Sequence, residues 1–140
     1  MSNIISGVPK EILLPDLPSL LPLLLQSLSL KSPALRANAI NTLYVMVMES
    51  PEIMASQLDT MIPALLTQIE CKSSNPPSVR IAALRCLGIL PTQLPFESID
   101  PFKKRLVRQL GTVLDDSKRA VRKDAVDCRH AWYSSSGKVS

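Results

Sequence analysis

The sequence predicts an all-α protein, and more specifically an α-solenoid of three stacked helical hairpins. Hydrophobic and proline positions recur with a period of 41 residues, which is typical of repeats built from pairs of helices. Apolar residues make up 46% of the 140-residue chain and aromatic residues only 4%, a composition that favours helices packed on helices over a sheet. The repeating positions are Leu17, Pro22 and Leu28, then Leu58, Pro63 and Ile69, then Ile99 and Leu110.

Each repeat is expected to hold a helix A followed by a helix B. Asp16, Ser50 and Asp100 precede the A helices as candidate N-caps. Pro51 and Pro101 stand in first-turn positions, where a missing N–H costs no helical hydrogen bond. The prolines expected to mark connections are Pro33, Pro77 and Pro91. The expected helices are 17–30 and 34–49, then 52–71 and 78–90, then 101–114 and 118–132.

The three B helices align on one short pattern, V-R-x-x-A, with Leu in place of Val in the first copy. Apolar positions fall at i, i+4, i+7 and i+11, so one stripe of each helix faces its partner helix A. Cys86 and Cys128 occupy the small position that Thr42 holds in the first copy, and both are expected to pack in the core. In the third copy the stripe consists of Val121, Ala125, Cys128 and Trp132.

This pattern resembles the HEAT-repeat family, whose repeats carry a Pro inside helix A, an Asp before helix B, and then V-R-x-x-A. Pro22 and Pro63 match the family, whereas Lys104 stands at the third position. The family's Asp appears only as Asp116, six residues before Arg122, and HEAT proteins commonly pair these two side chains to brace neighbouring hairpins. The resemblance therefore implies three HEAT-type hairpins with a weaker brace in the first two.

The two ends of the predicted solenoid differ. Helix 17–30 is apolar on all sides, whereas the last helix B carries Lys123, Asp124 and Arg129 on its outer face. This contrast predicts the C-terminal end of a longer array, with a neighbour missing before the first helix. The alternative is that apolar residues between 4 and 13 cover that helix. The expected boundaries are 1–15 for a linker or repeat remnant, 16–133 for three repeats (about 17–50, 51–91 and 95–133), and 134–140 for a disordered tail.

Positive charge is concentrated in the third repeat. The chain has a formal charge of +4, but residues 1–100 sum to −2 and residues 101–140, with 10 basic and 4 acidic groups, sum to +6. Such a surface could bind an acidic protein, track phosphates, or merely solvate a terminal cap. The candidate partner-binding residues are Lys103, Lys104, Arg105, Arg108, Lys118, Arg119, Arg122, Lys123, Arg129, His130 and Trp132.

Catalytic, metal and membrane functions lack their sequence signals. Cys71, Cys86 and Cys128 form no C-x-x-C pair, and their odd number favours a reducing compartment. His130 is the only histidine, and the four glycines form no phosphate-binding loop. Prolines interrupt the apolar stretch 12–30, so no membrane span is expected. We therefore expect no enzyme activity, no cofactor and no bound metal.

A narrower resemblance rests on three segments: VPKEILLPDLPSLLPLLLQSL (8–28), SVRIAALRCL (78–87) and LDDSKRAVRKDAVDCRHAW (114–132). Over residues 8–133 the chain resembles the C-terminal repeats of the family of large HEAT-repeat adaptors of the cytosolic iron-sulfur cluster assembly targeting complex. This family is also known as the methyl-methanesulfonate-sensitivity, nucleotide-excision-repair homologues.

The resemblance implies a non-enzymatic scaffold in the cytoplasm and nucleus. Its implied partners are a small cluster-transfer subunit, a WD-repeat propeller subunit and, through the full-length protein, client enzymes of DNA replication and repair. In this family the C-terminal repeats carry the docking to the small subunit, so the basic face of repeat three is the candidate contact surface, with the groove at Arg85 and Gln109 as the fallback. The alternatives are a basic HEAT module that binds nucleic acid and a transport-receptor-like HEAT fragment.

Overall fold

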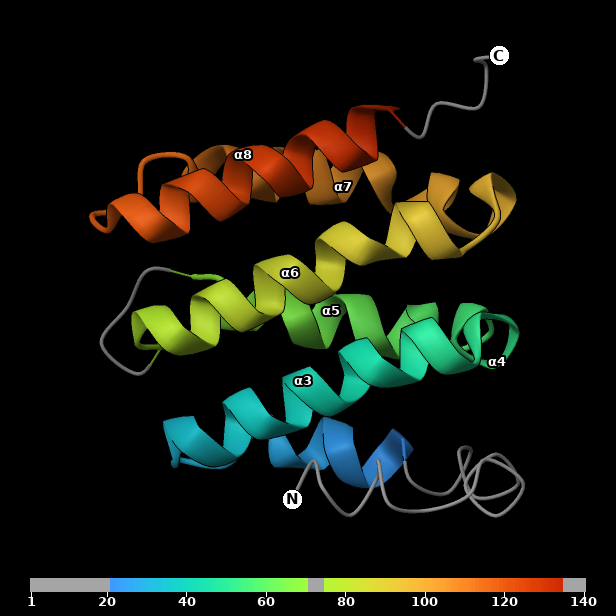
Figure 1. Cartoon of the computed structure of the whole chain (residues 1–140), viewed down its shortest axis with the longest axis horizontal. Coiled ribbons are helices and arrows are strands. Elements are labelled where there is room, and N and C mark those ends of the chain that lie inside the picture. Colours follow the sequence, from blue (N-terminus) through green and yellow to red (C-terminus); the bar gives the residue numbers. More distant parts are fainter. Residues whose placement is uncertain (1–20, 71–74, 135–140) are drawn as a thin grey trace.

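The computed structural model describes residues 21–70 and 75–134, which form helices joined by short turns (Figure 1). No strand occurs in these two ranges, so the all-α prediction is confirmed. Residues 21–27 are the described part of the first helix A. The other helices are α3 (Pro33–Glu49), α4 (Pro51–Ala55), α5 (Leu58–Gln68), α6 (Pro77–Gln93), α7 (Phe96–Val113) and α8 (Arg119–Ser134).

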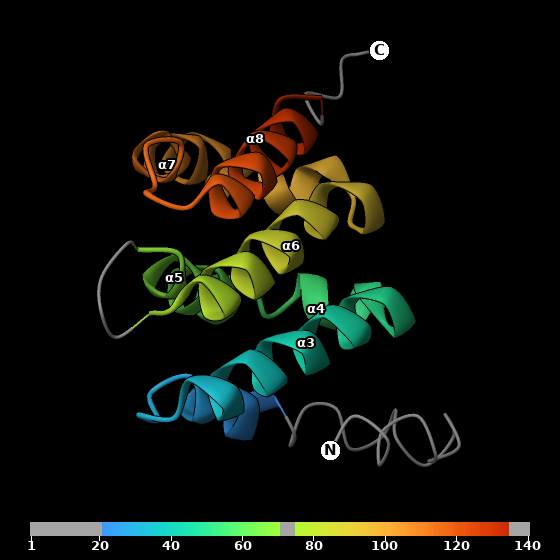
Figure 2. The ribbon, with the colours of Figure 1, turned by 60° about the vertical axis from the view of Figure 1, so that its left-hand side comes forward.

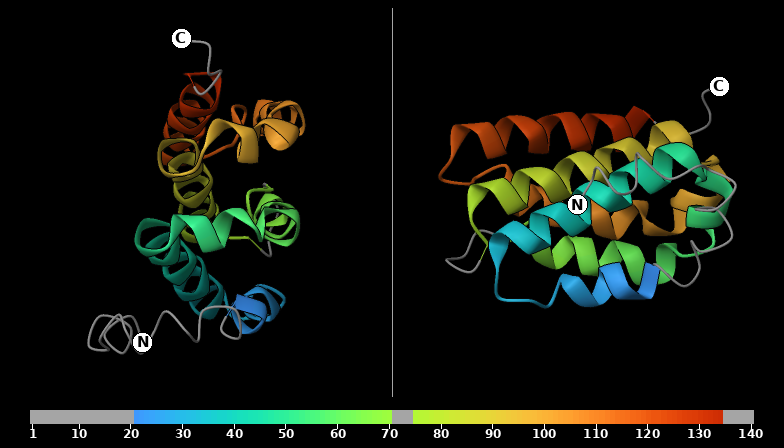
Figure 3. Two further views of the ribbon diagram at one scale, coloured as in Figure 1. Left: turned by 90° about the vertical axis from the view of Figure 1, so that its right-hand side faces the viewer. Right: turned by 60° about the horizontal axis from the view of Figure 1, so that its bottom comes forward.

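The helices form two layers, as a solenoid of hairpins requires. The B helices α3, α6 and α8 contact one another in sequence order, and the A helices α5 and α7 pack behind them (Figures 1 and 2). The view along the helices in Figure 3 shows these layers as two columns. A continuous core of aliphatic residues fills the space between the layers, so each hairpin is held mainly by its neighbours.

The predicted helix 52–71 is wrong as a single element, because the chain breaks it into α4 and α5. The hydroxyl of Ser56 donates a 2.7 Å hydrogen bond to the Ile53 carbonyl, and this local bond competes with continuation of the helix. Pro63, in contrast, lies inside α5, as the HEAT pattern implies. Helix A of repeat two is therefore a short turn of helix followed by a longer one.

The predicted start of the last helix A was also wrong. Helix α7 begins at Phe96, so Asp100 is not its N-cap and Pro101 lies within it. Likewise α6 continues past Pro91 to Gln93. A proline near a helix end removes only one backbone hydrogen bond, and burial of Ile99 stabilises the extra turn of α7.

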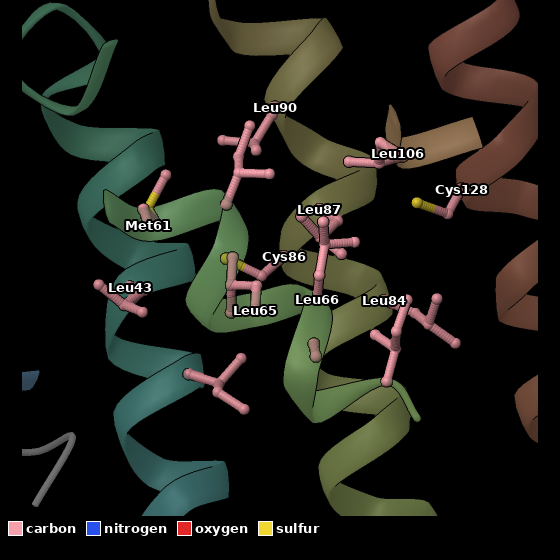
Figure 4. Packing of buried hydrophobic residues seen from close by; sticks show 14 of the residues in the cluster. Leu43, Met61, Leu65, Leu66, Leu84, Cys86, Leu87, Leu90, Leu106 and Cys128 are labelled. Carbon is pink, nitrogen blue, oxygen red and sulfur yellow. The ribbon is translucent and has the colours of Figure 1, made fainter. Parts of the chain in front are cut away.

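The predicted apolar stripe of the B helices is confirmed. The stripe positions of α6 and α8, including Cys86 and Cys128, are buried, and Figure 4 shows Cys86 beside Leu65 and Cys128 directed from α8 toward α6. The alignment fails in the two terminal copies, since Leu35 and Val126 are exposed and Thr42 is half-buried although their counterparts in the other helices are buried. The terminal copies lack one neighbour within the described residues.

The joint between repeats two and three differs from the expected brace. The buried carboxylate of Asp116 accepts a hydrogen bond from the buried guanidinium of Arg80, which belongs to the preceding repeat. Arg122, the expected partner, donates instead to the backbone carbonyl of Asp116 at 2.8 Å. The charge pair thus crosses between repeats rather than staying within one.

The joint between repeats one and two is braced by neutral side chains. Asn75, which lies 41 residues before Asp116, accepts a 2.8 Å hydrogen bond from Arg36 through Oδ1. Gln68 accepts a second bond from Arg36 at 3.3 Å and donates to the Leu28 carbonyl at 3.1 Å. The brace is therefore present in this joint, with amides in place of the carboxylate.

Several sequence predictions fall on residues outside the described ranges. They are the linker 1–15, the N-cap Asp16, Leu17, the cover by residues 4–13, Cys71, and the tail from residue 135 onward. Of the predicted all-round apolar helix, Leu21 and Leu28 are buried and Leu23 and Leu30 are exposed. Within the described ranges, no helix is both long and apolar enough to cross a membrane.

Candidate functional site

Most of the predicted basic residues lie at the surface of α7 and α8. Lys103, Arg122 and Arg129 are half-buried, and the other basic candidates are exposed. We call this set the basic surface. Its members are Lys103, Lys104, Arg105, Arg108, Lys118, Arg119, Arg122, Lys123, Arg129 and His130.

One part of the basic surface forms a recess between the two helices. Asp100, Lys103, Lys104 and Val107 of α7 line a surface cavity of about 470 Å³ together with Tyr133 of α8. The guanidinium of Arg129 lies 5.2 Å from the centre of the Tyr133 ring, which places a cation over its face. The antiparallel hairpin thus brings cations from the first half of α7 close to the last turn of α8.

The opposite end of α8 uses two of its cations in contacts within the protein. Arg122 holds the Asp116 carbonyl at the start of the helix, so its role there is structural. Lys123 lies 3.3 Å from the Asp127 carboxylate one turn later, an exposed pair that water and salt screen strongly. Lys118 and Arg119 are exposed beside them.

Trp132 does not belong to the accessible surface, and the prediction that placed it there is wrong. Its side chain is fully buried, and its indole Nε1 donates a 2.8 Å hydrogen bond to the Leu87 carbonyl of α6. The large ring fills the space between the last two B helices, where it continues the apolar stripe of α8. A buried donor with a fixed partner stabilises the fold rather than a complex.

A second recess lies on α3, α6 and α8, and the sequence predicted only one of its residues as a contact. It has a volume of about 420 Å³ and lies across the B helices, with Leu84, Gly88, Ile89 and Cys128 forming its apolar part and Asn41, Tyr44, Arg85, Asp124 and Asp127 its polar part. We call it the B-helix groove. Only Arg85 was named beforehand, as part of a fallback contact. The signal in the sequence is that Asn41, Arg85 and Asp127 occupy equivalent positions of the three aligned B helices.

The buried thiols are unsuited to metal binding or nucleophilic chemistry. Burial raises the pKa of Cys86 to about 12. Burial also raises the pKa of Cys128, with further contributions from Cys86 and the Asp124 carboxylate. Both thiols therefore stay protonated at neutral pH, whereas metal ligation and nucleophilic attack require the thiolate. Among the described residues, no cluster of three His, Cys, Asp or Glu side chains could hold a metal ion.

Comparison with known families agrees with this arrangement. The family model MMS19_C, described as "RNAPII transcription regulator C-terminal", matches residues 1–91, which is more than half of the chain. The chain belongs to this family. The resemblance inferred from the three sequence segments is therefore confirmed.

Curated relatives of the MMS19 family match almost the whole chain. The "DNA repair/transcription protein mms19" of Schizosaccharomyces pombe is 44% identical over 95% of the chain, and the match covers 13% of the relative. The "MMS19 nucleotide excision repair protein homolog" is 39% identical in Mus musculus and 38% in Homo sapiens, each over 95% of the chain and 12% of the relative. The chain thus spans about an eighth of these proteins, whose names refer to repair and transcription and to no enzymatic reaction.

Proposed function

We propose that this chain is a non-enzymatic docking domain of an MMS19-type adaptor. Its basic surface binds the small cluster-transfer subunit of the cytosolic iron-sulfur assembly targeting complex and so helps deliver clusters to apo client enzymes of DNA replication and repair. The observation that carries this proposal is the set of exposed cations on α7 and α8 in a helical-repeat chain of this family. The names of the relatives, which refer to DNA repair, support the choice of clients.

The charge of the basic surface suits an acidic protein partner. Residues 101–140 carry a net charge of +6, and seven of the ten basic candidates are exposed. Complementary potentials of this kind speed association and fix orientation, and they weaken as salt is added. The recess at Lys103, Lys104 and Tyr133 adds two cations beside an aromatic ring, against the single carboxylate of Asp100 in the same lining, and so favours an acidic side chain of the partner.

The proposal assigns cluster chemistry to other proteins. Cys86 and Cys128 are buried and their raised pKa values keep them neutral, so these two residues serve packing. The propeller subunit and the clients are expected to bind through the full-length adaptor, which works in the cytoplasm and nucleus. The chain itself needs no cofactor for such a role.

Charge reversal tests the proposed docking. The first variant carries Lys103→Glu, Lys104→Glu and Arg108→Glu, and the second carries Arg119→Glu and Lys123→Glu. Each is used to pull down the small subunit at low and at moderate salt. We expect at least one variant to lose about tenfold or more in affinity, with the larger loss at low salt. Normal binding by both variants would remove the basic surface from the proposal.

A matched control separates local contacts from general charge effects. Lys31→Glu reverses an exposed cation of repeat one and is expected to leave the pull-down unchanged. A titration with duplex DNA against salt tests the alternative that the basic surface binds nucleic acid. A phosphate-binding surface gives a steep salt dependence, whereas a protein-docking domain gives little binding at physiological salt. Trp132 is buried and therefore offers no stacking platform for bases.

A further inference from the structure

The B-helix groove places three equivalent positions of the solenoid around one recess. Asn41 of α3, Arg85 of α6 and Asp127 of α8 stand at the same register of their helices, and all three line the cavity of about 420 Å³. The B helices contact one another in order and form the layer that faces the viewer in Figure 1. A ligand that contacts all three side chains must therefore run across the helices as an extended segment.

The inner part of the groove is apolar around Gly88. A Cβ atom at this position would lie 3.5 Å from the Cα of Cys128, which is ordinary van der Waals contact, so α6 and α8 approach closely here and no side chain of residue 88 occupies the groove. Leu84 and Cys128 are buried below this part of the groove, and Ile89 is half-buried next to it. Such a lining suits the methylene groups of a long side chain.

The polar part of the groove is locally acidic, although the repeat around it is basic. The side chain of Asp124 is only 15% exposed, and the Arg85 Nε atom that pairs with it lies 3.7 Å away, beyond hydrogen-bonding distance. Asp127 pairs at 3.3 Å with Lys123, but both side chains are more than 60% exposed and solvent weakens their attraction. Both carboxylates can therefore accept a closer cation from a ligand.

We propose that the B-helix groove binds an extended basic peptide segment of a partner protein. The ammonium or guanidinium group of its Lys or Arg lies between Asp124 and Asp127, and the methylene stem covers Gly88 and Ile89. The amide of Asn41 and the hydroxyl of Tyr44 face the main chain of the segment at the other end of the groove. An acidic segment is excluded, since it would meet two carboxylates against one mostly exposed guanidinium, that of Arg85 beside Asp124.

This inference goes beyond the docking proposed for the basic surface and is independent of it. The basic surface selects an acidic protein, whereas the groove selects a basic segment. The groove lies on α3, α6 and α8, and α7 contributes no residue to it. One chain can therefore hold two partners of opposite charge, as an adaptor requires.

The test is an NMR titration of the ¹⁵N-labelled 140-residue chain. The probe is an acetylated and amidated peptide in which Lys, Leu and Arg stand in sequence between Ser and Gly residues, and the comparison peptide has Glu in place of Lys and Arg. We expect the basic peptide to shift the amide signals of Asn41, Gly88 and Asp127 and the acidic peptide to shift none of them. Combined Asp124→Asn and Asp127→Asn replacement should weaken binding about tenfold or more.

The matched control is Asp59→Asn, which removes an exposed carboxylate from the first turn of α5, outside the groove, and should leave the affinity unchanged. If the double variant loses helicity, Asp127→Asn alone replaces it, because that side chain is mostly exposed. The variant with Lys103, Lys104 and Arg108 changed to Glu should bind the peptide normally, which separates this test from that of the basic surface. Equal affinity for both peptides, or an unchanged affinity of the aspartate variants, would overturn the proposal.

Discussion

The two joints of the solenoid solve one packing problem with different chemistry. In each joint a buried arginine of one B helix reaches into the loop before the next: Arg36 contacts Asn75, and Arg80 contacts Asp116. In the first joint, the charged guanidinium of Arg36 therefore donates hydrogen bonds to neutral side-chain amides. In the second joint, Arg80 and Asp116 form a buried ion pair. The backbone geometry of the repeat tolerates both because each gives the terminal Nη1 atom of the buried guanidinium a buried acceptor.

The neighbours of each position explain which residue stands there. The amide nitrogen of Asn75 donates to the carbonyls of Thr67 and Glu70, at 2.8 and 3.2 Å, which a carboxylate could not do. The second carboxylate oxygen of Asp116 accepts instead from the Lys118 amide at 2.9 Å, just before α8 begins. The first joint thus needs a donor, and the second needs only acceptors.

Removing the charge partner in the second joint should have the largest effect. Asp116→Ala leaves the buried Arg80 guanidinium without its counter-charge, and loss of one member of a buried pair costs about 3–5 kcal/mol. Urea unfolding followed by circular dichroism measures this loss. The control Asp115→Ala removes the exposed neighbouring carboxylate and should change stability by less than about 0.5 kcal/mol. If both variants lost equally little, Arg80 would be satisfied without Asp116.

Converting the first joint to the chemistry of the second should also destabilise the protein. Asn75→Asp keeps an acceptor for Arg36 and adds a charge, but it replaces two donated hydrogen bonds by contacts between oxygen atoms. We expect a loss of about 1–3 kcal/mol in the same unfolding experiment. Asn38→Asp, on the exposed side of α3, serves as the control. A gain in stability would instead mean that ion pairing outweighs the lost donors.

The joints also show what the sequence could and could not predict. The V-R-x-x-A register gave the buried stripe because helical periodicity reflects burial directly. The same pattern did not predict that Arg80 pairs with Asp116, because Asp116 belongs to the next repeat. Asn75 was overlooked because the HEAT pattern calls for Asp at its position, although an amide also accepts a hydrogen bond from arginine.

The candidate sites divide in the same way. The exposed cations of α7 and α8 could be predicted, since charge is readable from composition and helical spacing. The burial of Trp132 was already implied by the apolar stripe, but its place near a basic run drew it into the predicted surface. The B-helix groove depends on how three helices from three repeats lie together. The equivalent positions of Asn41 and Asp127 in the sequence predict a shared groove only when it is also known that the B helices contact one another in order.

The smallest expected effect distinguishes repeat one from the other two at alkaline pH. Repeat one has Thr42 at the position that Cys86 and Cys128 fill in the later repeats. Burial raises the pKa of Cys86 to about 12 from an ordinary value of 9.0, so above pH 9 the unfolded chain loses the thiol proton while the folded chain keeps it. Below pH 9 both states keep the thiol proton, so the full stability of the folded protein is present there and is lost only as the pH rises above 9. Between the two pKa values each pH unit should lower the free energy of unfolding by about 1.4 kcal/mol for this thiol.

Urea unfolding under reducing conditions at pH 8.5 and pH 10 measures this slope, with Cys86→Ala as the comparison. The variant has a cavity and is less stable at both values, but its stability should fall less between them because one titrating group is absent. Thr42→Ala, which changes the equivalent position of repeat one, should keep the full slope of the unaltered chain. If Cys86→Ala showed the same slope as the unaltered chain, the thiol would be ionising in the folded protein. Repeat two would then be more open to solvent than its packing indicates.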